Sequence, residues 1–109
     1  MLYTFCCFDK PEAVGVRAAN REAHLAFLSE LGDRLFLAGP FLSEDGSAMV
    51  GSLIIVDCED MAAARALAAH DPYAKSGLFS SVAIRPWRKV FPKSQRGHTV
   101  STDPESTSP

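Results

Sequence analysis

The sequence predicts one α+β domain with the element order β-α-β-β-α-β, which occupies residues 1–91 of a chain of 109 residues. Two observations support this prediction. Four apolar runs of strand length alternate with two helical patterns in that order, and a chain of this length usually forms a single domain. This is the order of the ferredoxin-like arrangement, in which a four-stranded antiparallel sheet carries both helices on one face.

The first two elements are a strand and a long helix. Residues 2–8 are apolar and aromatic, which is typical of a strand that is buried on both faces or covered by a partner. Asp9 suits the N-cap region of a helix, and Pro11 suits its first turn. The helix is expected over residues 14–31, with Gly32 as its C-terminal stop.

The later elements follow from the same kinds of signal. Asp45-Gly46 is typical of a hairpin turn, and the apolar run 52–56 indicates a strand in the centre of the sheet. Acidic residues before Met61 suit the start of an alanine-rich helix, and Pro72 ends that helix. The expected ranges are strands at 34–42, 48–57 and 78–87, a helix at 61–70, a turn at 44–47 and a loop at 74–77.

Residues 92–109 differ in composition from the domain before them. They are rich in Ser, Thr and Pro and contain almost no apolar side chains. Such a segment cannot bury enough apolar surface to offset the entropy lost on ordering. We therefore expect a disordered tail there.

Composition and charge exclude several classes of function. The net charge is −2 with acids and bases interspersed, so we expect neither nucleic acid nor an anionic membrane surface as a partner. No apolar run approaches the roughly 18 residues of a membrane span. The first residues resemble a strand and not a secretory signal, which points to the cytoplasm. Three cysteines without paired spacing are expected to be reduced thiols, at Cys6, Cys7 and Cys58.

The apolar strands also predict an assembly. Both helices are expected on one face of the sheet, so the other face is uncovered in a monomer. Strands as apolar as residues 2–8 and 52–56 would leave a large apolar patch there. We therefore expect a homodimer in which two sheets pack face to face, forming an α+β barrel.

The first helix carries polar groups on its apolar side. At about 100° per residue, its apolar positions fall within one arc of roughly 140°, and Arg17, Arg21 and His24 fall within the same arc. Two guanidinium groups and an imidazole are thus directed toward the rest of the chain, which indicates a polar pocket or a partner surface. The apolar positions of this arc are Val14, Ala18, Leu25, Leu28 and Leu31.

These three polar groups suit acid–base chemistry. Histidine is the side chain best able to move a proton near neutral pH, so His24 is a candidate general base. Nearby cations favour its neutral form, which a base needs, and Arg17 and Arg21 would bind an anionic or enol-type oxygen of a substrate. The alternative is a network of ion pairs with Asp or Glu at the edge between helix and sheet.

Asp71 is the candidate partner of His24. It follows the end of the second helix, where the helix dipole disfavours a carboxylate, so a cation or imidazole should lie nearby. An Asp–His pair would fix the tautomer of the imidazole. The alternative is an Asx turn before Pro72. We expect no metal and no cofactor, because the histidines lack paired ligand spacing and phosphate-binding glycine motifs are absent.

The chain resembles the YciI-like (YCII-related) family over residues 1–91. The resemblance rests on a set of short motifs in which no departure is found. They are Arg17-x3-Arg21-x2-His24-Leu25, Leu37-Ala38-Gly39-Pro40, Gly51-Ser52-Leu53, Asp71-Pro72-Tyr73, Gly77-Leu78-Phe79 and Val82-x-Ile84-Arg85-Pro86-Trp87.

The resemblance implies a dimeric α+β barrel related to muconolactone-isomerase-type folds, with a His–Asp site at His24 and Asp71. One branch of the family resembles a dehydrochlorinase of chlorinated hydroxyhydroquinones, which implies proton abstraction from an aromatic or enol substrate. The leading hypothesis is a cofactor-independent lyase or isomerase acting on a small anionic or phenolic ligand. The alternatives are a non-catalytic binding or assembly module and an accessory domain that uses the tail as a tether.

Overall fold

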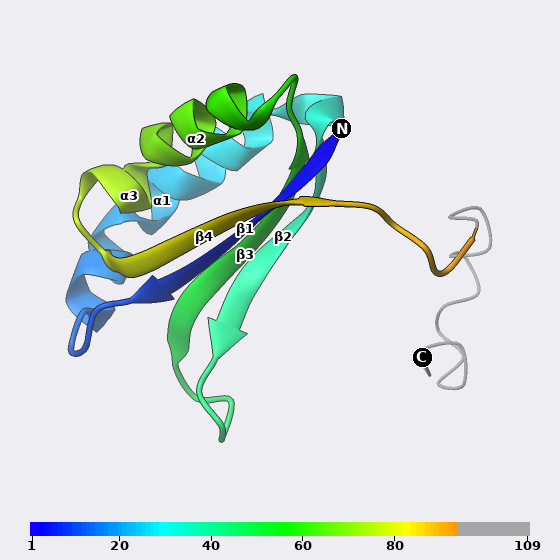
Figure 1. The fold of residues 1–109 in the computed structure, drawn as a ribbon. Coiled ribbons are helices and arrows are strands. Elements are labelled where there is room, and N and C mark those ends of the chain that lie inside the picture. The colour runs from blue at the N-terminus through cyan, green and yellow to red at the C-terminus, as the bar shows by residue number, and fades with distance from the viewer. Residues whose placement is uncertain (94–109) are drawn as a thin grey trace.

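The computed structural model describes residues 1–93, and most of the predicted tail, residues 94–109, lies outside the described residues. Four strands form one antiparallel sheet in the order β2-β3-β1-β4. The helices lie together on one face of this sheet (Figure 1), so the predicted ferredoxin-like arrangement is confirmed. The elements are β1 (Leu2–Asp9), α1 (Val14–Glu30), the 3₁₀ turn η1 (Gly32–Arg34), β2 (Leu35–Leu42), β3 (Met49–Asp57), α2 (Met61–His70), α3 (Pro72–Lys75) and β4 (Phe79–Trp87).

The two central strands carry the core. Side chains alternate between the faces of a strand, and Phe5 on β1 pairs with Ile54 on β3 so that both point toward the helices. Both are almost fully buried, which confirms the central position predicted for residues 52–56. At the end of this row, Cys7 lies opposite Ser52, and these two residues form the floor beneath the helix α1.

Both ends of α1 are set by local backbone geometry. The chain turns through Glu12, whose φ is 59°, and the helix begins only at Val14. The prediction that Asp9 caps this helix is wrong, because Asp9 is the last residue of β1 and its carboxylate binds Arg17. The predicted stop at Gly32 is confirmed, since its φ of +58° is readily adopted by glycine.

The segment after α2 is helical where the sequence analysis expected a loop. Residues 72–75 form the short helix α3. The proline occupies its first turn, where the missing N–H is not needed, and the Asp71 carboxylate accepts a hydrogen bond from the backbone N–H of Tyr73 at 2.9 Å. This helix turns Tyr73 into the interior, where it is 1% exposed.

The predicted inward arc of α1 is buried along only one side. Arg17 and His24 are buried, as expected, but Val14 is 66% exposed and Arg21 is also exposed. The prediction that the whole arc packs inward is therefore wrong. One side of the arc contacts β1 and α3, while the other faces an open groove beside the β2–β3 hairpin. Of the five apolar positions, Leu31 is buried, Leu28 is half-buried, and Val14, Ala18 and Leu25 are exposed.

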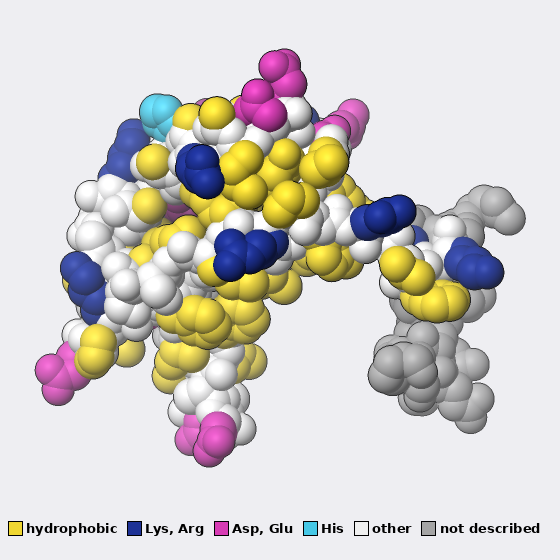
Figure 2. All heavy atoms as spheres, viewed as in Figure 1, with side chains coloured by type: hydrophobic (Ala, Val, Ile, Leu, Met, Phe, Trp, Pro, Cys, Tyr) yellow, Lys and Arg dark blue, Asp and Glu magenta, His cyan; other side chains and the backbone are white. Residues whose placement is uncertain are grey.

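The sheet face opposite the helices is apolar and carries no helix within residues 1–93. Hydrophobic side chains gather over the strands on the visible side of the molecule (Figure 2). On this face, Leu37 is 44% exposed, and the Phe36 and Trp87 rings lie 5.8 Å apart. The Thr4 hydroxyl is buried on this face without a hydrogen-bond partner among the described residues. In that same part of the chain, no helix has the length and hydropathy needed to cross a membrane.

Candidate functional site

The candidate site is a cavity of about 150 Å³ between α1 and the β2–β3 hairpin. α1 forms one wall with a row of side chains spaced three or four residues apart, and β2 forms the other wall with a segment of small residues and proline. The inner end is closed by α3. The lining residues are Arg17, Arg21, His24, Leu25, Leu28, Ala38, Gly39, Pro40, Met49, Ser52 and Tyr73.

His24 and Asp71 form a buried hydrogen bond at the inner end of this cavity. The His24 Nδ1 and Asp71 Oδ1 atoms are 2.8 Å apart. Asp71 Oδ1 also accepts the Tyr73 backbone N–H, so the carboxylate is held in place by α3. A carboxylate can only accept hydrogen bonds, so the neutral imidazole carries its proton on Nδ1. The Nε2 atom of His24 then has a free lone pair.

Tyr73 lies between His24 and Arg17. The imidazole of His24 stacks on the Tyr73 ring, with 4.0 Å between centroids and 17° between planes. The guanidinium carbon of Arg17 is 4.5 Å from the same ring centroid. One face of the ring is covered by the imidazole, so the guanidinium occupies the other face. The Tyr73 ring therefore makes a stacking contact with His24 and a cation–π contact with Arg17.

Arg17 is held by a buried ion pair. Its Nε donates to Asp9 Oδ2 at 2.7 Å. Its Nη2 donates both to Asp9 Oδ1 at 2.9 Å and to Ser52 Oγ at 3.0 Å. Burial opposes the charge of Arg17, but the hydrogen bond and negative charge of Asp9 outweigh it, so the pKa of Arg17 is raised. Together these groups form a buried column, defined as Asp9, Arg17, Tyr73, His24 and Asp71.

The Tyr73 hydroxyl of the column and the Cys7 thiol beneath it remain neutral near pH 7. Burial raises the pKa of the Tyr73 hydroxyl, although the charges of Arg17 and Arg21 oppose this shift. Burial, with a smaller effect from the negative charge of Asp71, raises the pKa of Cys7 to about 12. Since the thiolate is the nucleophilic form of cysteine, Cys7 serves as part of the floor and not as a nucleophile.

The structure brings some of the predicted site residues together and separates others. His24 and Asp71 meet, and Asp71 makes the expected Asx-type contact as well. Arg17 adopts the alternative arrangement, an ion pair at the edge between helix and sheet. Arg21 lines the cavity, is exposed, and forms no ion pair within residues 1–93.

Sequence analysis missed three members of the site, which are Asp9, Ser52 and Tyr73. Ser52 and Tyr73 belong to the motifs quoted for the family resemblance, which could have marked them. Asp9 had no such signal, because its contact with Arg17 depends on how α1 docks against the end of β1.

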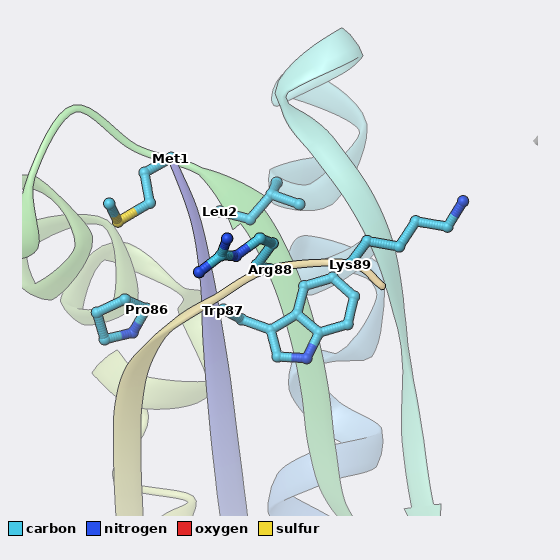
Figure 3. Close-up of a pocket in the computed structure, with 6 residues that line it drawn as sticks. All are labelled: Met1, Leu2, Pro86, Trp87, Arg88 and Lys89. Carbon is cyan, nitrogen blue, oxygen red and sulfur yellow. The ribbon is translucent and has the colours of Figure 1, made fainter. Parts of the chain in front are cut away.

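A larger hollow elsewhere in residues 1–93 is lined by no histidine and no carboxylate. The hollow in Figure 3 has a volume of about 460 Å³ and lies beside the start of β1 and the end of β4. Its side chains are apolar or cationic and include no histidine or carboxylate, being Met1, Leu2, Pro86, Trp87, Arg88 and Lys89. Within the described range 1–93, no three His, Cys, Asp or Glu side chains are grouped so that they could hold a metal ion.

Comparison with known proteins identifies relatives across the described part of the chain. The model of the YCII-related domain matches residues 1–88. Protein YciI of Escherichia coli is 38% identical over 98 residues, covering 84% of this chain and 100% of that protein. An uncharacterised protein of Haemophilus influenzae is 37% identical over 98 residues, covering 84% of this chain and 100% of that protein.

A solved structure is similar as well. It is the 5-chloro-2-hydroxyhydroquinone dehydrochlorinase of Burkholderia phenoliruptrix AC1100, in complex with 2,5-dihydroxybenzoquinone. It is 31% identical to this chain and superposes with a TM-score of 0.76. The match covers 83% of this chain and 96% of the dehydrochlorinase.

The ion pair between Asp9 and Arg17 should be a major source of stability. In the Asp9→Asn variant, the buried guanidinium of Arg17 loses its counter-charge, which should lower the free energy of unfolding by about 3–5 kcal/mol. Urea denaturation followed by circular dichroism measures this loss. The matched control is Glu22→Gln, which removes an exposed carboxylate from the same helix. Equal stability of the two variants would contradict the role given to the pair.

Proposed function

The chain belongs to the family of YCII-related proteins, and on this premise we propose that it is a small-molecule enzyme of the lyase or isomerase type that needs no cofactor. His24 acts as the general base, and Asp71 orients it. The observation that carries the proposal is the 2.8 Å hydrogen bond between His24 Nδ1 and Asp71 Oδ1. It leaves Nε2 as the ring nitrogen available to a molecule bound in the cavity.

The proposed reaction begins with proton transfer to His24 Nε2. A C–H or O–H bond of the substrate breaks, and its electron pair stays on the substrate, where it is delocalised onto a ring or enol oxygen. The negative charge of Asp71 stabilises the imidazolium that forms. The imidazolium can then return the proton to a different atom, which is an isomerisation. Alternatively, the retained electron pair forms a new double bond while an adjacent leaving group departs with its own bonding pair, which is an elimination.

Arg21 is the proposed principal binder of the substrate's negative charge. It lines the cavity three residues before His24, and it forms no ion pair with any residue from 1 to 93. Arg17 lines the same cavity, but its Nε and Nη2 atoms donate to Asp9 and Ser52. We therefore assign Arg17 a contribution through its positive charge, and Arg21 a direct contact with a substrate oxygen.

The size of the cavity favours a single-ring substrate. A cavity of about 150 Å³ is the size that accommodates one benzene ring. The dehydrochlorinase that resembles this chain acts on a hydroxylated ring and was solved with a dihydroxylated quinone. These two facts support a phenolic or enolic ring as the substrate of this chain.

The alternative function is non-catalytic binding of the same kind of ligand. Removal of His24 separates the two functions. A screen of phenolic and lactone compounds should identify a substrate of the wild type. The kcat for that substrate should fall by about 10²–10⁴-fold in His24→Ala, because a positioned base contributes that much. His70→Ala, which changes the histidine at the end of α2, should retain the wild-type rate.

The same screen includes a binding measurement with 2,5-dihydroxybenzoquinone. Ligand binding by the wild type without turnover of any compound would favour the binding module. Turnover that is unchanged in His24→Ala would remove His24 from the mechanism.

We also propose that the protein is a homodimer in which the open sheet faces pack together. The support is an apolar face with half-exposed side chains such as Leu37, and the Thr4 hydroxyl within it, which has no hydrogen-bond partner in residues 1–93. Contiguous apolar patches of this kind usually mark an interaction surface. A second copy of the chain offers a matching apolar face, as two-fold symmetric dimers require.

Sedimentation velocity at micromolar concentration tests this assembly. The wild type should sediment as a dimer, and Leu37→Glu should sediment as a monomer because a carboxylate would be buried in the interface. Val14→Glu introduces the same charge on the helix side of the molecule and should remain dimeric. A wild-type monomer would contradict the proposal.

A further inference from the structure

A second hollow continues the candidate site along α1. Its volume is about 230 Å³, and it shares Arg17, Arg21 and Met49 with the cavity that contains His24. We call the cavity at His24 the inner lobe and this second hollow the outer lobe. Because both are lined by the same helix and the same hairpin, a molecule bound in one lobe can extend into the other.

The walls of the outer lobe are apolar. Val14 and Ala18 line it from α1, and Ala48 and Met49 line it from the hairpin and the start of β3. Val14 is 66% exposed and Met49 is 38% exposed. These side chains are therefore not part of the core, and a bound apolar group would remove part of their surface from water.

Among residues 1–93, the polar side chains that line the outer lobe are already hydrogen-bonded to other residues, with one exception. The Ser47 hydroxyl and backbone N–H both donate to Asp45 Oδ1, at 2.8 Å and 3.0 Å. The guanidinium of Arg17 is held by Asp9 and Ser52, so Arg17 presents its aliphatic stem. The exception is Arg21, which lines both lobes and therefore lies at their junction.

We propose that the substrate is an ionised ring with an aliphatic chain, and that the chain binds in the outer lobe. The ring occupies the inner lobe beside His24, and an ionised ring oxygen contacts Arg21. The aliphatic chain is attached to the ring carbon adjacent to the carbon that bears this oxygen. From His24 to Val14 the helix spans about 15 Å at 1.5 Å per residue, which gives room for a ring and a chain of several carbons. This inference rests on the proposed function, since it places the ring at the proposed base.

The test is a titration of the full-length chain with 2,5-dihydroxybenzoquinone and its 3-propyl and 3-hexyl derivatives. We expect the Kd to tighten by about twofold to fourfold for each methylene that enters the lobe, because burial of each group removes apolar surface from water. Isothermal titration calorimetry measures the Kd directly. Equal affinity for the three probes would overturn the proposal.

The matched variants are Ala18→Trp, which fills the outer lobe, and Ala26→Trp, which adds the same ring to an exposed position of α1. Ala18→Trp should abolish the increase in affinity that the aliphatic chain provides, and should leave the affinity for the unsubstituted quinone within about twofold of the wild-type value. Ala26→Trp should bind all three probes like the wild type. If Ala18→Trp weakens all three probes equally, the two lobes are not separate and the proposal is overturned.

The outcomes also separate this inference from the proposed function. If the wild type binds the unsubstituted quinone and the aliphatic chain does not increase the affinity, the proposed ring site is retained and the role of the outer lobe is overturned. Binding of only the hexyl probe, lost in Ala18→Trp and kept in Ala26→Trp, would support the outer lobe and count against the ring as substrate. Binding of none of the probes by the wild type would overturn both.

Discussion

The carboxylate of Asp71 is the contact on which the site depends. One oxygen of this group accepts two hydrogen bonds, one from the Tyr73 backbone N–H and one from His24 Nδ1. The first fixes the start of α3, and the second fixes the imidazole on α1. α3 in turn inserts the Tyr73 ring against that imidazole. A single buried charge therefore determines both the position of His24 and which of its nitrogens remains available.

The rest of the buried column explains why α1 carries charge on an inward side. Transfer of an arginine from water to the interior is costly unless the charge is paired. Asp9 accepts two hydrogen bonds from the guanidinium, Ser52 accepts a third, and the Tyr73 ring covers one face of the guanidinium. The same docking leaves the other side of the arc facing the open groove, so the helix contributes to the core and to both lobes at once.

Most of the fold could be predicted from local signals. The alternation of strand and helix patterns was sufficient for the order of elements. The apolar run 52–56 predicted the central position of β3, and a glycine after the helical pattern predicted the stop at Gly32. Contact between His24 and Asp71 was predicted from the need for a counter-charge and from the family resemblance. In the structure, His24 Nδ1 and Asp71 Oδ1 are in hydrogen-bond contact. The role of Asp9 and the exposure of Val14 were not predictable, because both depend on the tilt of α1 over the sheet. Helical periodicity defines an arc of side chains, but the part of that arc which becomes buried is decided by tertiary packing.

The tautomer of His24 tests most directly whether Asp71 orients the imidazole. Nitrogen-15 NMR of the histidine-labelled protein distinguishes a protonated from an unprotonated ring nitrogen at a pH where the ring is neutral. We expect a proton on Nδ1 and none on Nε2 in the wild type, and loss of this preference in Asp71→Ala. A wild-type ring that carries its proton on Nε2 would contradict this expectation, since Asp71 would then not be the acceptor that holds the base.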